Sequence, residues 1–157
     1  MANREHLRIM KRGIRAWNAW RTKSHVVHPD LAGADLAKVD LHGANLEFAN
    51  LARANLSNAI LHGANLESAN LARANLSNAS LFGANLARAD LRGADLESAE
   101  LIRTSLAATN LARANLTKAS FIDADLTKAN LEKANLRQAH LWQPRFIRTS
   151  VRGADFT

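Results

Sequence analysis

The chain has 157 residues, a formal net charge of +7 and no cysteine. The length predicts a single domain, and the absence of cysteine excludes disulfides, thiolate metal sites and cysteine nucleophiles. Aromatic residues make up only 5% of the chain and tyrosine is absent, so a core of large rings is excluded.

Residues 1–28 are predicted to form a cap, which consists of an amphipathic helix over residues 4–21 and a linker. Apolar side chains recur there at helical spacing, basic side chains cluster on the opposite side, and Asn3 is a suitable N-cap. A basic amphipathic helix can bind a membrane surface or a partner, or it can cover the end of a repeat domain. We favour the covering role, for which the apolar residues are Leu7, Met10, Ile14, Trp17 and Trp20.

A period of five residues runs through residues 29–157. A large apolar residue stands at every fifth position from Leu31 to Phe156, at 26 positions, of which 22 are leucine. Two positions earlier the residue is alanine at 20 of these 26 sites, and the unit reads A-(N/D)-L-x-x. A helix would scatter such leucines around its axis, and a strand would send them to both faces. A backbone that turns a corner every five residues points each Leu and Ala inward, with Asn, Asp and Gly at the corners.

A longer period of 20 residues is also visible, because residues 41–60 and 61–80 differ at only two positions. This tandem unit resembles the pentapeptide repeat proteins, over residues 29–157. The resemblance implies an all-β solenoid, a right-handed quadrilateral β-helix of about 6.5 coils with an N-terminal capping α-helix. The segment LRIMKRGIRAWNAWR, followed by HPDLAGADL, also resembles the N-terminal lead-in of bacterial members, especially cyanobacterial ones.

Stacking at a period of 20 residues places side chains in outward columns with neighbours about 4.8 Å apart. One column aligns several large apolar residues. Aligned apolar residues usually mark an interface, although the cap, the linker or a neighbouring corner can cover them instead. We define this apolar stripe as Ile60, Phe82, Ile102, Ile122 and Trp142.

A second outward column is basic. Its side chains are suited to contact the phosphates of a nucleic acid, or they form a solvated face and pair with Asp90, Glu132 or Asn side chains. No aromatic residue interleaves with them, so stacking on single strands is not supported. We define this basic column as Arg53, Arg73, Arg92, Arg113 and Lys133.

The C-terminal coils are predicted to mediate a homodimer. We expect no later segment to cover the last coil, and an uncovered edge invites pairing. The residues expected near this contact are Phe146, Val151 and Phe156.

No catalytic, cofactor or metal site is predicted. His42 and His62 are expected to stack as neighbours, but two ligands without a third make a poor metal site. A solid rod filled by Leu and Ala leaves no cavity for a substrate. We therefore expect a non-enzymatic, cytoplasmic scaffold that binds an unidentified protein and has no membrane span.

Two other functions stay open. The family resemblance implies a DNA mimic that binds DNA gyrase or topoisomerase IV and gives fluoroquinolone resistance, but a basic rod has the wrong sign of charge for mimicry. The other function is nucleic-acid binding through the basic column. Against it, the middle of the rod, residues 31–100, carries a formal charge of −3, so the positive charge is gathered at the two ends.

Overall fold

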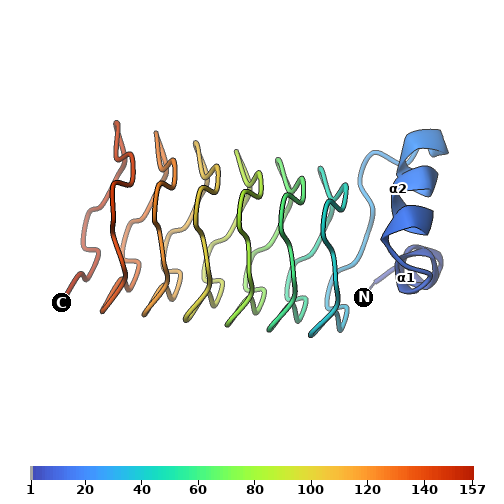
Figure 1. The fold of residues 1–157 in the computed structure, drawn as a ribbon, viewed down its shortest axis with the longest axis horizontal. Coiled ribbons are helices and arrows are strands. Elements are labelled where there is room, and N and C mark those ends of the chain that lie inside the picture. The colour runs from blue at the N-terminus through green and yellow to red at the C-terminus, as the bar shows by residue number, and fades with distance from the viewer. Residues whose placement is uncertain (1) are drawn as a thin grey trace.

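The computed structural model describes residues 2–157 as a stack of coils with two helices at one end, α1 (Arg4–Lys11) and α2 (Ile14–Lys23) (Figure 1). Parallel bridges join residues 20 positions apart along the whole stack, from Asp30 with Asn50 to Asn135 with Asp155. The bridging residues recur at every fifth position, so each coil has four sides. The predicted β-solenoid is confirmed in this form, whereas its right-handed winding and its count of about 6.5 coils stay predictions.

Each side of a coil is short because a turn follows every bridge. The Leu71 carbonyl accepts a hydrogen bond of 3.0 Å from the Ala74 N–H, and Arg73, the third residue of that turn, has φ 59°. A positive φ at this position is the feature of a type II turn. As a result, the described residues form isolated single-residue bridges and contain no extended strand.

The interior of the stack is filled, as predicted, by leucine and alanine at the repeat positions up to Leu136, whereas the repeat centres from Leu141 onward are partly exposed. Leu91 and Ala94 illustrate the pattern, since both are buried. Where threonine replaces alanine, the hydroxyl finds a backbone partner: Thr104 Oγ1 donates to the Leu81 carbonyl at 2.8 Å, and Thr109 Oγ1 donates to the Leu86 carbonyl at 2.7 Å. These bonds satisfy the two hydroxyls in an otherwise apolar interior.

The cap consists of two helices, so the prediction of one continuous helix over residues 4–21 is wrong. Gly13 separates α1 from α2 and has φ 97°, a conformation that side chains other than glycine rarely adopt. The break lets both helices lie across the end of the first coil (Figure 1). The N-cap at Asn3 is confirmed, because its side-chain oxygen accepts from the N–H groups of Glu5 and His6.

The cap is held to the coils mainly through α2. Trp17 is completely buried, and its indole N–H donates to the Asn45 carbonyl at 2.7 Å. Arg21 donates to the carbonyls of Val26 and Glu47, and its burial lowers the pKa of its guanidinium, against the influence of Glu47. The predicted contact residue Met10 is also buried, as is Ile9, which was not predicted, whereas the other predicted contact residues are only partly buried: Leu7, Ile14 and Trp20. Within residues 2–157 no helix is long and apolar enough to cross a membrane.

Candidate functional site

The basic column lies at one corner of the stack. Four of its members occupy the third position of their turns, where φ lies between 58° and 61°; these are Arg53, Arg73, Arg113 and Lys133. Gly33, Gly93 and Gly153 occupy the same position in other coils, so glycine interrupts the column. Arg92, the fifth predicted member, stands one residue earlier in its turn, beside Gly93.

Only Arg92 of the basic column forms an ion pair among residues 2–157. Its guanidinium contacts the Asp90 carboxylate at 2.7 Å. The hydrogen bond from the Arg92 side chain is the main cause that lowers the pKa of Asp90. Among residues 2–157 the other four members have no carboxylate partner, so the predicted pairing with Glu132 does not form.

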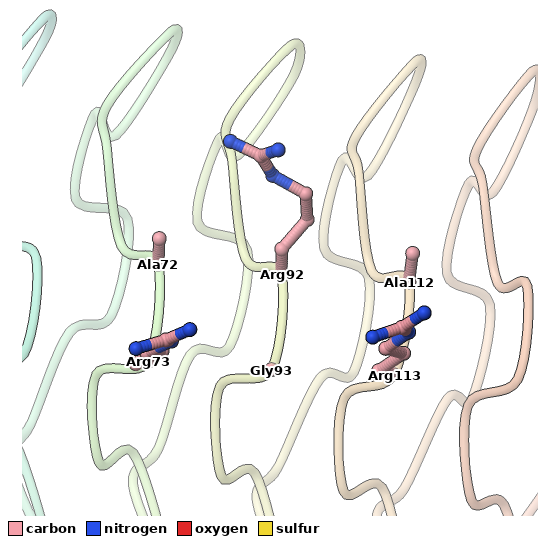
Figure 2. A pocket seen from close by; sticks show the side chains of 6 residues that line it. All are labelled: Ala72, Arg73, Arg92, Gly93, Ala112 and Arg113. Carbon is pink, nitrogen blue, oxygen red and sulfur yellow. The ribbon is translucent and has the colours of Figure 1, made fainter.

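A shallow hollow opens in the basic column at Gly93. It has a volume of about 420 Å³ and is lined by Ala72, Arg73, Arg92, Gly93, Ala112 and Arg113. Figure 2 shows Arg73 and Arg113 on the two coils that flank Gly93, while the guanidinium of Arg92 is turned away from it. We call this feature the basic hollow. A second hollow of about 420 Å³ lies at Gly33 and has one arginine in its lining, Arg53.

The apolar stripe runs along another face of the stack. Trp142 is 66% exposed, Phe82 is 43% exposed and Ile60 is 41% exposed, whereas Ile102 and Ile122 are half-buried. Trp142 and Ile122 line a hollow of about 490 Å³ together with Ala139, His140 and Leu141.

Two histidines extend the apolar stripe toward the cap. The rings of His42 and His62 are 6.1 Å apart, and those of His62 and Phe82 are 6.2 Å apart. His62 Nε2 is 2.7 Å from Ser80 Oγ, which in turn donates to Glu100 at 2.5 Å. Within the part of the chain that the structure describes, no group of three His, Cys, Asp or Glu residues could hold a metal ion.

The C-terminal end of the stack is apolar. Phe146, Val151 and Phe156 are between 37% and 46% exposed and line a hollow of about 310 Å³ with Thr149. We call these four residues the C-terminal patch.

The family model for pentapeptide repeats matches residues 30–63, 59–97 and 99–138. The chain belongs to the pentapeptide repeat family. This match confirms the family that the repeat unit predicts, and the stacked four-sided coils with inward Leu and Ala agree with it. A comparison with curated proteins finds no significant match.

Several solved pentapeptide repeat structures are similar to this chain. Rfr23 from the cyanobacterium Cyanothece is 40% identical, with a TM-score of 0.56, over 56% of this chain and 60% of its own. HetL from the cyanobacterium Nostoc, which is involved in heterocyst differentiation regulation, is 36% identical, with a TM-score of 0.34, over 80% of this chain and 65% of its own. QnrB1, a plasmid-mediated fluoroquinolone resistance protein, is 19% identical, with a TM-score of 0.41, over 83% of this chain and 82% of its own. The origin of Rfr23 confirms the predicted likeness to cyanobacterial pentapeptide repeat proteins.

Three exposed apolar residues of this pentapeptide repeat protein were not predicted as surface candidates from the sequence. Ile147 is exposed beside the C-terminal patch, Leu141 is exposed beside Trp142, and Phe48 packs its ring against His28. Leu141 stands at a repeat centre, where the period predicts burial. Ile147 stands next to the centre Phe146, but its column differs from that of the apolar stripe and contains no other large apolar residue in the coils, so no sequence signal could have found it.

Proposed function

We propose that this pentapeptide repeat protein is a non-enzymatic scaffold that binds a partner protein through the apolar stripe. The alignment of Phe82, Ile102, Ile122 and Trp142 in one outward column carries the proposal. Exposed large apolar residues are ordinary when scattered, but a contiguous patch beside a hollow marks an interaction surface. A tryptophan that is 66% exposed is also the kind of anchor that protein interfaces favour. The absence of cysteine fits the cytoplasmic location that we propose with it.

The contact between His62 and Ser80 does not support catalysis. A serine is activated when a base takes its proton and a carboxylate orients that base. Here the Ser80 hydroxyl donates to Glu100 instead, so the hydroxyl oxygen accepts from His62. The carboxylate therefore contacts the serine and not the histidine that it would have to orient. The coils behind this contact are filled with Leu and Ala, which leaves no substrate cavity there.

A pull-down with the variant Phe82→Ser/Trp142→Ser tests the apolar stripe. We expect this double variant to lose a partner that the unaltered protein retains, because both substitutions remove exposed apolar area from one face. The control variant is Phe48→Ser/Ile147→Ser, which removes two exposed apolar residues away from the stripe. Equal loss of the partner from both variants would contradict the proposal.

Gyrase binding is a weaker alternative. The formal charge of +7 opposes imitation of DNA. A DNA supercoiling assay with the protein added separates the two functions, and we expect neither inhibition nor protection of gyrase. Nucleic-acid binding through the basic column is the remaining alternative, and it requires an affinity for DNA that falls steeply with salt.

We also propose a homodimer through the C-terminal patch. Its aromatic and aliphatic side chains expose apolar surface in one place, which a second copy can bury. Light scattering at tens of micromolar tests this, with Val151→Ser/Phe156→Ser as the variant expected to be monomeric. A monomer in the unaltered protein at that concentration would contradict the homodimer and leave the role of the apolar stripe unaffected.

A further inference from the structure

The basic hollow differs from the rest of the basic column because a glycine, Gly93, lies between two arginines on the neighbouring coils. Gly93 has no side chain, and Arg73 and Arg113 lie on the preceding and following coils, on either side of it (Figure 2). Neither Arg73 nor Arg113 has an ion pair or a side-chain hydrogen bond among residues 2–157. The third cation, Arg92, is neutralised by its contact with Asp90. The hollow therefore holds a charge of +2 without a carboxylate to balance it.

The separation of the two arginines suits one small anion. Arg73 and Arg113 are two coils apart, which corresponds to about 10 Å between their backbones. A guanidinium presents a planar fork of donors, and charge-assisted bonds of about 2.8 Å on each side of a tetrahedral oxyanion span such a gap. The flanking residues Ala72 and Ala112 are small, so the approach from solvent is open.

We propose that the basic hollow is a binding site for a phosphate-class oxyanion, held between Arg73 and Arg113 over Gly93. The anion is either inorganic phosphate or the terminal phosphate of a larger molecule. This site goes beyond the proposed scaffold function, because it lies on a different face from the apolar stripe and needs none of its residues.

A continuous nucleic-acid backbone fits this column less well. The phosphates of one strand advance by about 3.4 Å per nucleotide along the axis of a duplex, whereas the coils advance by about 4.8 Å along the stack, so the two repeats do not match. Gly33, Gly93 and Gly153 divide the cations into two short groups, so the column cannot contact successive phosphates along its length. The interruption that opens the hollow thus favours a single anion over a strand.

The test is a titration of the ¹⁵N-labelled full chain with inorganic phosphate at constant ionic strength, followed through amide chemical shifts. We expect saturable shifts around Gly93 in the unaltered protein. Arg73→Gln and Arg113→Gln should each weaken binding by about tenfold or more, since each removes charge-assisted hydrogen bonds. Arg148→Gln is the matched control, because Arg148 has the same place in its turn on another face, with φ 56°, and forms no ion pair among residues 2–157. We expect less than about a twofold change from it.

Gly93→Gln tests the hollow itself without changing the charge. Gln138 and Gln143 adopt φ 57° and 52° at the same position of their turns, so the fold accommodates glutamine there. The added side chain fills the space between the two arginines, and we expect the saturable shifts to disappear. Binding that survives in Gly93→Gln, or that falls equally in Arg148→Gln and Arg113→Gln, overturns the proposal, as does a linear response in the unaltered protein.

Two further titrations identify the source of the anion. Glycerol phosphate has a terminal phosphate and should bind with an affinity within a few-fold of inorganic phosphate, by the same Arg73 and Arg113 contacts. A short thymidine oligonucleotide without terminal phosphate has phosphodiesters only, and we expect no saturable shift around Gly93. Tighter binding of that oligonucleotide than of both monoesters would overturn the single-anion site in favour of a strand.

Discussion

The two ends of the stack are built from the same repeat unit but differ in the burial of its central apolar residue. At the N-terminal end the centre Leu31 is fully buried, because α1 and α2 cover it and Trp17 is completely buried among them. At the C-terminal end the centre Phe156 is 46% exposed, although it holds the equivalent place in its unit. A repeat unit cannot bury its own apolar face and depends on a neighbour to do so. The difference therefore lies in what stacks on the coil and not in the unit itself.

Trp17→Ala tests the N-terminal half of this comparison and should have the largest effect. The substitution leaves a cavity under the cap and removes the hydrogen bond to the Asn45 carbonyl. We expect the free energy of unfolding in urea to fall by about 3–5 kcal/mol. Trp20→Ala is the control within the same helix, and it should cost less because Trp20 is only partly buried.

Phe156→Ala tests the C-terminal half. Nearly half of this ring is already in contact with water, so its truncation should lower the free energy of unfolding by only about 1 kcal/mol. The same urea titration, made at low concentration to keep the chain monomeric, measures it. A cost as large as that of Trp17→Ala would mean that both ends are equally well packed, and the comparison would fail.

Asn3→Ala removes the N-cap of α1. Its side-chain oxygen accepts from the N–H groups of Glu5 and His6 at 2.9 and 3.3 Å. We expect a loss of about 0.5–1 kcal/mol, near the lower end for caps because Asn3 is exposed and water can replace it. Circular dichroism during thermal unfolding measures the change, and Asn3→Asp, which preserves the cap, should restore the stability. A loss that Asn3→Asp shares would contradict the capping role.

The smallest effect concerns pH at the C-terminal end. Hydrogen bonds from the backbone and side chain of Thr157, with Arg137 nearby, hold the pKa of Asp155 below its ordinary value. A carboxylate with a lowered pKa stabilises the fold above its unfolded pKa of about 4, and the contribution is lost as the pH falls through the folded value. We therefore expect the ¹⁵N relaxation of Thr157 to show increasing motion below pH 4, with the cap unchanged.

Asp155→Asn is the control for this pH dependence. Its amide oxygen can still accept from Thr157 but cannot titrate, so the motion of Thr157 should no longer vary between pH 5 and 2 in this variant. A pH response that persists in Asp155→Asn would assign the effect to another group.

The candidate surfaces were only partly predictable from the sequence. A period of 20 residues is sufficient to align Phe82 with Trp142 and Arg73 with Arg113, because parallel stacking converts sequence separation directly into distance. The sequence offered Asp90 and Glu132 as partners for the basic column, but it could not show that only the pair of Arg92 with Asp90 forms while Arg73 and Arg113 stay unpaired among residues 2–157, since that depends on side-chain reach around a corner. Nor could it show that glycine at position 93 opens a hollow between two free arginines.

The sequence by itself determined the repeat, the four-sided coil and the identity of the inward residues. It could do so because residues in contact between coils are always 20 positions apart, so the period of the sequence directly gives the tertiary contacts. The tertiary structure alone decided how the stack ends. Trp17 is buried because Gly13 redirects α2 across the first coil, and Phe156 is exposed because no coil among residues 2–157 stacks on it. Contacts at the ends have no periodic counterpart in the sequence, so only the packed chain reveals them.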